Sequence, residues 1–479
     1  MASIVSITLI MLGCSENIEV KPRLAVDLGS AYSSPEALSA ALNGVFDVLQ
    51  TTDIYGRDLI AIPEALSDNG RATNKSGRLV GENQNQPGAS FINWSNSYVG
   101  INRANLILKA LPTSAAPQAT KDVIEGQCLF IRALFYFDLM RAYAYYPKAI
   151  VAPQNIGGVP LILEGVADLT QVTQPSRASI DACYTQIFAD LNSAVGKLTN
   201  TNTTYRAPFF ATKGAAQALA SRVALYAGNW QEVVKQSTDA LASGVGRFQT
   251  NAQYVASWRA ASNPESMFEL SYQTAENVGV NTSLQTTYTT LRDPGNRATT
   301  AGFGDLVPSP SMISALGITR TVDVLTRTAD VRSLLYEVGT AGRGPAEIEC
   351  TKFIGRSGTV NLDNIPVIRI SEMFLNRAEA NYELGNIAGA LADLNQIRTR
   401  AGLAAAPATL TGQALLDDIL NQRRVELAFE GHRFHDLKRR GLDIVKSPRT
   451  ITFNDFLILA RIPTGEISLN PNLKQNFGY

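Results

Sequence analysis

The sequence predicts a mainly α protein in which helical hairpins are interrupted by a loop-rich, partly extended subdomain. Apolar residues recur three and four positions apart up to about residue 245, and again from about residue 370 to 440, which is the spacing of an amphipathic helix. Between these regions, residues 246–365 are rich in Gly, Pro, Thr, Ser and Asn and lose that period. The 479 residues are 45% hydrophobic and 18% charged, so the chain is long and apolar enough for one large folded domain or two to three small ones.

The N-terminal region is expected to contain four helices. Ser34-Pro35-Glu36 starts the first, which runs to about Leu49, because proline is favoured in the first turn of a helix. Residues 51–90 are rich in Asn, Gly, Ser and Gln and are expected to form a loop. The third helix carries a dense apolar and aromatic face from Phe130 to Leu139. The second, third and fourth helices are expected at about 91–111, 121–145 and 179–198, respectively.

A short pattern then occurs twice. Ala220 to Asn229 (ASRVALYAGN) is similar to Arg377 to Asn386 (RAEANYELGN), and in each copy Gly-Asn separates two helical runs. Small residues allow the two helices to pack closely, as in a hairpin of the tetratricopeptide type, which needs stacked neighbours to bury its faces. The two copies lie far apart, so the array is interrupted. The alternative is two unrelated helical hairpins.

The second half mixes loops with helices. Short extended pieces are expected at Met267–Leu270 and Cys350–Ile354 within residues 246–365, and loops this long are usually functional. Helices return at about 370–400 and about 415–440, and the last forty residues read as irregular.

The N-terminus ends an apolar run at a cysteine. Ile4 to Leu12 is apolar, Gly13 is small, and Cys14 follows, as at the cleavage site of a lipoprotein signal. Acyl chains on Cys14 would anchor the protein to a membrane, at about 0.8 kcal/mol for each buried methylene. The absence of Lys or Arg before the run and Met11 depart from the usual pattern and are consistent with a truncated start. The alternative is a short buried helix or a disordered leader.

Charge and cysteine content exclude several classes of protein. The formal net charge is zero, which argues against a nucleic-acid partner because phosphate binding needs a basic face. Beyond Leu12 no segment has the roughly 20 apolar residues that cross a bilayer. The remaining cysteines lie far apart without CxxC, so no disulfide framework, zinc site or other metal site is predicted, and Cys128 and Cys183 read as buried apolar residues.

Several segments together resemble the SusD/RagB family of nutrient-binding outer-membrane lipoproteins. The most specific is Arg423 to Leu437 (RRVELAFEGHRFHDL). Small departures from the family's usual residues occur at Gln422, just before this segment, and at Phe434 within it. The tail resembles the family as well, with Phe477 where proline is common. The other matching segments are Phe130–Leu139 with Gly158-Val-Pro160, Thr212–Ala216 running into Gly228-Asn-Trp230, and Arg377–Ala380 with Leu394–Leu403. The resemblance covers nearly the whole chain in the family's order and implies a SusD-like α/α superhelix.

The resemblance also implies a function and a partner. It predicts a lipid-anchored protein at the outer-membrane cell surface that captures an oligosaccharide and delivers it to a SusC-like TonB-dependent transporter as a hinged lid. No cofactor is implied. Some relatives take up peptides, so a RagB-like peptide-binding protein is one alternative, and a cytosolic repeat scaffold is another.

Catalysis is the less favoured interpretation of the charged helix. Arg423, Glu426, Glu430 and Arg433 share one helical face, and a glycoside hydrolase would require two such carboxylates in a cleft. Arginines within a turn should lower both pKa values and leave no proton donor near neutrality, so we interpret the group as a structural ion network. The only histidines, His432 and His435, lack the further ligands of a closed zinc site. The stretch Gly342-Arg343-Gly344 lacks the strand and helix of a phosphate-binding loop.

Binding residues are expected on the side where the family places its ligand surface. Sugars are recognised by aromatic faces and by amide and carboxylate groups, so exposed aromatic residues beside polar loops are the candidates. The alternative for Trp94 and Tyr98 is packing within the first hairpin, and Trp230 and Trp258 more often belong to the core. The candidate ligand-binding residues are Asp68, Asn69, Arg71, Asn74, Trp94, Asn96, Tyr98, Tyr272 and Tyr288.

These expectations divide the chain into six segments. They are a signal segment (1–13), a lipid-anchored tether (14–34), an N-terminal helical region (35–245), a loop-rich ligand-face subdomain (246–365), C-terminal tetratricopeptide-like helices (366–440) and an irregular C-terminal segment (441–479).

Overall fold

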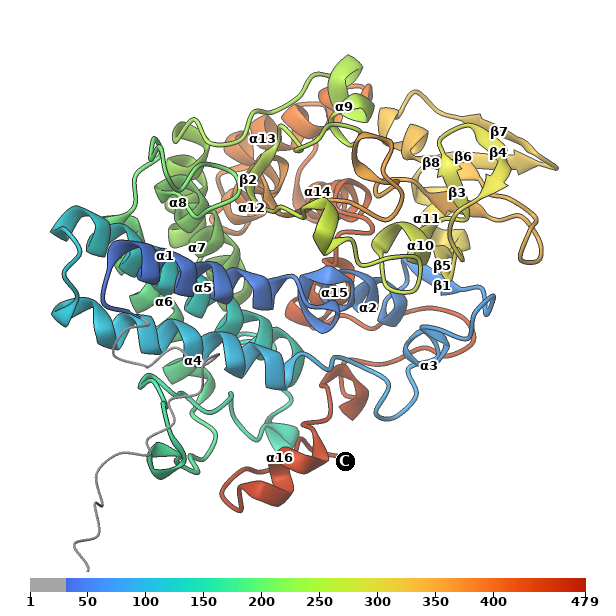
Figure 1. Cartoon of the computed structure of the whole chain (residues 1–479). Helices are drawn as coiled ribbons and strands as arrows, with labels where there is room; N and C mark the ends of the chain where they lie inside the picture. Colours follow the sequence, from blue (N-terminus) through green and yellow to red (C-terminus); the bar gives the residue numbers. More distant parts are fainter. Residues whose placement is uncertain (1–31) are drawn as a thin grey trace, which may run out of the picture.

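The computed structural model describes residues 32–479 and is mainly α-helical, as expected (Figure 1). The signal segment and Cys14 lie outside the described residues. The four helices expected in the N-terminal region are present and pack in sequence, α1 on α4, α4 on α5 and α5 on α6. Their bounds are α1 Pro35–Leu49, α4 Trp94–Ala110, α5 Gln118–Tyr143 and α6 Ile180–Lys197.

Local signals in the sequence account for the ends of these helices. The Ser34 side chain accepts a hydrogen bond from the backbone N–H of Ala37 while Pro35 occupies the first turn, and Ser179 caps α6 in the same way. The aromatic face of α5 lies in the core, where Phe130, Phe135 and Phe137 are fully buried. Close packing of α4 on α5 requires Gly100, because a Cβ there would lie 2.2 Å from the Phe135 ring.

The repeated Gly-Asn pattern forms two hairpins of the same design. Gly228 (φ 68°) and Gly385 (φ 78°) adopt the left-handed conformation that ends a helix, and Asn229 and Asn386 cap the next one. The hairpins are α7 (Lys213–Ala227) with α8 (Trp230–Ala242), and α12 (Ile370–Glu383) with α13 (Ile387–Ala401). Helix α12 packs against α8, so the two copies are neighbours in space although about 150 residues separate them in the chain.

Most of the strands that the structure describes lie in the loop-rich region, and all pair antiparallel in twos. Figure 1 shows several of these sheets gathered at the end of the molecule opposite α1 and α6. The pairs are β1 Gly70–Ala72 with β5 Leu306–Pro308, β2 Ser266–Leu270 with β10 Ile365–Arg369, β3 Leu291–Asp293 with β4 Asn296–Thr300, β6 Ile318–Thr321 with β7 Val324–Arg327, and β8 Tyr336–Val338 with β9 Ile348–Cys350.

Two strand expectations had different outcomes. The expected piece Met267–Leu270 lies within β2. Of the extended piece expected at Cys350–Ile354, only Cys350 lies in a strand, because β9 ends there, opposite Tyr336 at the start of its partner β8.

The structure corrects the expected loop at residues 51–90. This segment contains the helical turn η1 (Thr52–Gly56) and the helices α2 (Asp58–Leu66) and α3 (Val80–Asn83). Every residue of α2 is buried, so tertiary packing of its apolar side chains outweighs Pro63 in the helix interior.

The expected helix at 415–440 is broken into α14 (Gly412–Glu426) and α15 (Arg433–Arg439). Phe429 and Gly431 have positive φ between them, and a Cβ on Gly431 would lie 2.5 Å from the Leu59 carbonyl of α2. The remaining helices are α9 Asn251–Ser257, α10 Leu284–Tyr288, α11 Pro310–Ala315 and α16 Thr464–Leu469, and short 3-10 turns lie at Leu111–Thr113, Ala152–Gln154, Leu169–Gln171, Thr274–Glu276, Val331–Leu335, Arg356–Gly358 and Phe456–Ile458.

Three cysteines are buried free thiols, as expected for Cys128 and Cys183; the third is Cys350. Among the described residues, none of the helices has the length and apolar character needed to cross a bilayer.

Candidate ligand-binding face

The candidate residues of the first polar loop mostly brace the fold. Asp68 is 9% exposed, and its carboxylate receives hydrogen bonds from the Arg433 guanidinium at 2.7 and 2.8 Å. Asn69 is fully buried and bonds Glu64 and Arg424. Both side chains therefore join this loop to the C-terminal helices, and the structure places neither at the surface.

Arg71 and Asn74 remain accessible. The Arg71 side chain is 41% exposed and pairs with Glu347 at 2.8 Å. Asn74 is exposed and adopts a left-handed backbone (φ 60°) at the end of β1. These two are the candidates from the loop that a ligand can reach.

The aromatic candidates are mostly in the core. Trp94 is 2% exposed and packs on Tyr98 and Tyr143, while the half-buried Tyr98 donates its hydroxyl to the Pro160 carbonyl. Tyr272 is 4% exposed and Tyr288 is fully buried. Trp94 and Tyr98 therefore pack within the fold, which was the alternative interpretation. Tyr272 and Tyr288 are buried in the same way and do not lie at the surface. Asn96 is half-buried and donates to the Asp53 carboxylate at 2.8 Å.

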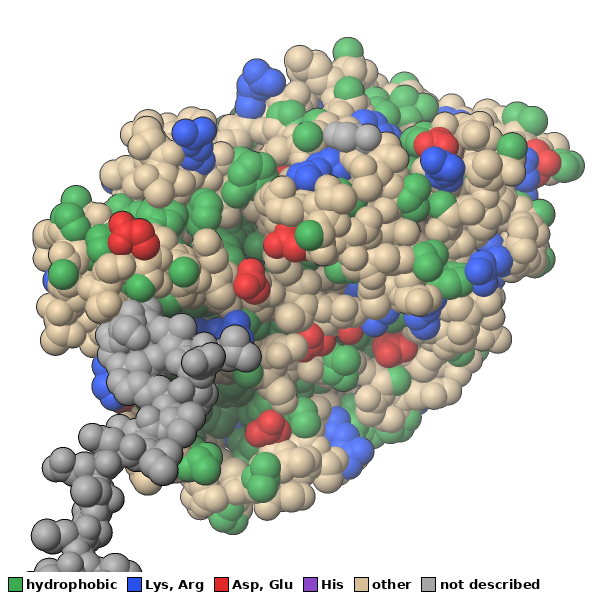
Figure 2. Space-filling view, in the orientation of Figure 1, with side chains coloured by type: hydrophobic (Ala, Val, Ile, Leu, Met, Phe, Trp, Pro, Cys, Tyr) green, Lys and Arg blue, Asp and Glu red, His purple; other side chains and the backbone are tan. Residues whose placement is uncertain are grey.

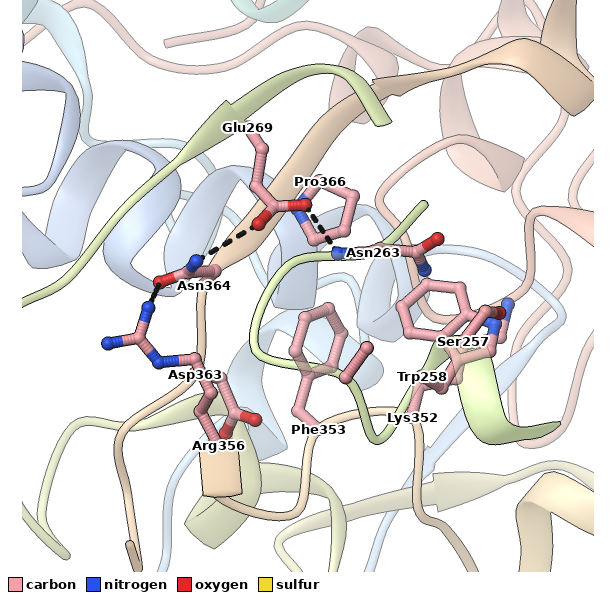
Figure 3. A pocket seen from close by; sticks show the side chains of 11 residues that line it. Ser257, Trp258, Asn263, Glu269, Lys352, Phe353, Arg356, Asp363, Asn364 and Pro366 are labelled. Atoms are coloured by element: carbon pink, nitrogen blue, oxygen red, sulfur yellow. Dashed lines mark hydrogen bonds between the residues drawn. The ribbon is translucent and has the colours of Figure 1, made fainter. Parts of the chain in front are cut away.

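A small polar pocket lies beside Trp258, within the loop-rich region (Figure 3). Glu269 is its centre, because its carboxylate accepts hydrogen bonds from the Asn263 backbone and from the Asn364 amide, both at 3.0 Å. The Asn364 oxygen in turn accepts from Arg356 at 2.7 Å. The cavity is about 20 Å³, enough for a water-sized group and too small for a sugar ring.

Two buried donors in this pocket have no hydrogen-bond partner, the Asn263 amide nitrogen and the Trp258 indole nitrogen. Burial raises the pKa of Glu269, and it raises that of Asp363 on the pocket wall to about 7. Trp258 itself is 8% exposed with Lys352 and Arg369 over its ring, so it belongs to the core, as expected. The pocket is therefore too small to accommodate a saccharide.

A cluster that the sequence interpretation missed lies at the surface nearby. The guanidinium carbons of Arg78 and Arg343 lie over the Phe303 ring, 4.4 and 4.0 Å from its centroid. Arg343 is exposed, and Arg78 and Phe303 are half-buried. The sequence around Arg343 shows only two flanking glycines. Phe303 lies 40 positions from Arg343 and 225 from Arg78, so no local pattern reveals the cation–aromatic contacts.

The surface on this side of the molecule is mainly polar. Figure 2 shows charged side chains standing mostly apart from one another on a tan surface over the loop-rich region. Such a surface offers hydrogen-bonding groups to a polar ligand. We define the loop-rich face as Arg71, Asn74, Arg78, Phe303 and Arg343.

The charged segment from Arg423 to Arg433 is a buried ion network. Glu426 is fully buried, and its carboxylate lies 2.7 Å from Arg400 and 3.3 Å from Arg369. Glu430 is 7% exposed and pairs with Arg369 and Lys352. Burial alone would raise the pKa of Glu426, but the Arg400 and Arg369 guanidinium groups hold it well below its ordinary value. Both carboxylates are buried and paired with arginine or lysine, in agreement with the interpretation as a structural ion network.

The histidines are also internal. Burial holds the pKa of His432 and of His435 well below 6.5, so both are neutral. Among the described residues no group of three or more His, Cys, Asp or Glu side chains is arranged to hold a metal ion.

Comparison with known proteins identifies relatives along the whole chain. The pattern of the family described as "SusD family" matches residues 348–445, and that of "Starch-binding associating with outer membrane" matches residues 19–225. SusD-like protein P2 of Formosa agariphila is 23% identical over 98% of this chain and 97% of its own. The starch-binding protein SusD of Bacteroides thetaiotaomicron is 27% identical over 33% of each chain.

Solved structures agree with the sequence matches. A putative sugar-binding protein from Bacteroides vulgatus superposes with a TM-score of 0.78 at 27% identity, covering 93% of this chain and 99% of that one. A SusD superfamily protein from Bacteroides thetaiotaomicron gives 0.79 at 26% identity, covering 92% and 99%. A laminarin-binding SusD-like protein gives 0.72 at 22% identity, covering 94% and 100%, and supports the fold.

Proposed function

We propose that this chain, which belongs to the SusD-like family, captures oligosaccharides on its loop-rich face and passes them to a SusC-like TonB-dependent transporter in the outer membrane. The observation that carries the proposal is the match of residues 19–225 to the family described as starch-binding and associated with the outer membrane. A relative named as a starch-binding protein adds to it.

The mechanism needs binding and no chemistry. The helical hairpins form a rigid back, and the loop-rich face presents guanidinium and amide groups that can bond sugar hydroxyls. Lipidation at Cys14 would hold the body at the cell surface, and the chain would sit over the transporter mouth as a hinged lid. The lid closes when the ligand binds the closed state better than the open one. The carboxylates of Glu426 and Glu430 are buried and cannot reach a substrate, which supports a function without catalysis.

Calorimetry with the purified chain tests the ligand class. We expect mixed oligosaccharides to bind and mixed peptides of similar length not to bind. R71A/N74A should weaken the sugar affinity at least about tenfold, because hydrogen bonds to a charged group contribute about 1.5–3 kcal/mol. K235A, on the exposed surface of α8, is the matched control and should bind as the wild type does. Binding of peptides alone would support the RagB-like alternative, and release of reducing sugar would contradict the proposal.

Affinity purification from solubilised outer membranes tests the partner. A C-terminally tagged full-length chain is expected to retain a TonB-dependent barrel protein. The variant C14A should lose the acyl mass in mass spectrometry and should be found in the fraction that membranes do not retain, because no lipid then anchors it. Recovery of an acylated chain without any barrel protein would remove the delivery step from the proposal.

A further inference from the structure

The stack of Arg78, Phe303 and Arg343 contains two guanidinium groups that differ in how they are paired. Arg71, Lys75 and Arg78 each have a carboxylate within 4 Å, those of Glu347, Glu349 and Asp305. Within residues 32–479, Arg343 forms no salt bridge or hydrogen bond; it lies over the Phe303 ring, and its charge opposes the rise in the pKa of the Asp305 carboxyl. Its guanidinium donors are therefore available to a ligand.

Two of the three paired carboxylates of this region are buried. Asp305 is 1% exposed and Glu349 is fully buried. Glu349 accepts hydrogen bonds from the backbone and hydroxyl of Thr290, and burial raises the pKa of both acids. Because both acids are buried, neither covers the exposed Arg343 guanidinium, which remains open to an anionic group in solvent.

The stack is built on a fixed base. The Phe303 backbone N–H donates to the carbonyl of Thr286 in α10 at 3.0 Å. A Cβ on the preceding Gly302 would lie 2.1 Å from the Thr289 carbonyl, so the loop is pressed against that helix. Arg78 is held by Ser76 at 3.0 Å and by the Asn281 carbonyl. Phe303 and Arg78 are therefore already ordered, and a ligand that meets them loses little conformational entropy at these two residues.

A neutral sugar is not expected to bind this cluster by stacking on its aromatic ring. Neutral sugars stack on open aromatic faces, and here guanidinium groups lie over the ring of Phe303. Guanidinium forks match the two oxygens of a carboxylate or a sulfate, and such charge-assisted bonds are the stronger kind. Packing alone does not account for Arg343, because Arg78 already joins residues 76–78 to Phe303 and Asn281.

We propose that the loop-rich face selects acidic oligosaccharides, bearing uronate or sulfate groups, and that Arg343 with Arg78 over Phe303 is the selecting cluster. The inference rests on the proposed function, since it names the class of saccharide bound at the same face. Uronate and sulfate share the anionic, multi-oxygen group that guanidinium recognises, and experiment separates them.

Three tetrasaccharides of equal length serve as probes, namely a galacturonate, a sulfated galactose and a neutral galactose oligomer, titrated into the full chain at low and high salt. The wild type is expected to bind at least one acidic probe about tenfold or more tightly than the neutral one, and the ratio should shrink at high salt. In R343Q the acidic-to-neutral ratio should fall about tenfold, and R343K should restore part of it as a point charge without the fork. K235Q removes one positive charge elsewhere and should keep the wild-type ratio.

The outcomes separate the inference from the function beneath it. Binding of all three probes with equal affinity, or a wild-type ratio in R343Q, overturns the inference and leaves glycan capture standing. Failure of every saccharide to bind overturns both. Because Arg343 is exposed between two glycines, R343Q is expected to melt at the wild-type temperature, and that measurement confirms that the ratio reports recognition.

Discussion

Replacing Arg369 with methionine is expected to lower the free energy of unfolding by at least about 3 kcal/mol, because removing one partner of a buried ion network strands the others. Arg369 is 1% exposed at the end of β10. Its guanidinium lies 2.7 Å from carboxylate oxygens of both Glu265 and Glu430, and 3.3 Å from Glu426. Methionine fills a similar volume, but the buried carboxylates of Glu265, Glu426 and Glu430 each lose their ion pair with Arg369.

The network matters because it joins parts of the chain that are distant in sequence. Glu265 precedes β2, Arg400 belongs to α13, and Glu426 and Glu430 end and follow α14. Lys352 of the loop-rich region bonds Glu430 and the carbonyls of Glu426 and Ala428. Loss of Arg369 should therefore loosen the attachment of the loop-rich region to the helical back.

Urea unfolding of the wild type and variants measures the effect. The matched control is K235M, which breaks an exposed pair on α8 and should cost less than about 1 kcal/mol. R369M/E430Q should recover part of the loss, since one stranded charge is neutralised. An R369M variant as stable as K235M would mean that the carboxylates are not dependent on this arginine.

The sequence predicted the helical frame because the signals for that frame are local. Pro35 in a first turn, the aromatic face of α5 and the two Gly-Asn breaks each act within a few residues, and the structure bears each of them out. Helix α2 was missed for the opposite reason. Its polar surroundings and Pro63 argue against a helix, and burial against Gly431, about 370 residues away, stabilises it.

The candidate binding residues show where sequence interpretation ends. Trp94 and Tyr288 have the residue types that bind sugars, but the same side chains pack well in a core, and the sequence does not distinguish the two environments. Arg343 was visible only as a residue between two glycines. Its significance depends on Phe303 and Arg78, which the fold brings to it. Charge pairing was easier to predict, since the Arg423–Arg433 segment carries both signs at helical spacing.

Glu64 is expected to make the protein less stable as the pH rises from about 4.5 to about 7. This carboxyl is fully buried in α2, where it accepts hydrogen bonds from Asn69 at 2.9 Å and from the Gly431 backbone at 3.0 Å. Burial raises its pKa from 4.5 to about 7, although these bonds and Lys352 act in the opposite direction. The native state therefore binds the proton more tightly than the unfolded chain does.

The sign of the effect follows from that difference. Below pH 4.5 both states are protonated and the full contribution is present; it is lost between 4.5 and 7, where the unfolded chain ionises freely and the native state does not. Each tenfold change in proton affinity corresponds to about 1.4 kcal/mol, so the loss amounts to about 3 kcal/mol. E64Q cannot ionise, and its stability relative to the wild type should rise by that amount across the same interval.

Urea unfolding at pH 4.5, 5.5, 6.5 and 7.5 measures this relative stability. The exposed variant T201S removes no ionisable group and is the control, so its difference from the wild type should stay nearly constant over the interval. Only the change with pH is diagnostic, because the amide also alters the hydrogen bonds to Asn69 and Gly431 by an amount that does not titrate. A flat difference would show that Glu64 ionises alike in both states. A fall in the relative stability of E64Q with rising pH would show that the carboxylate is stabilised in the fold, in which case the contact between α2 and Gly431 is an ionic one.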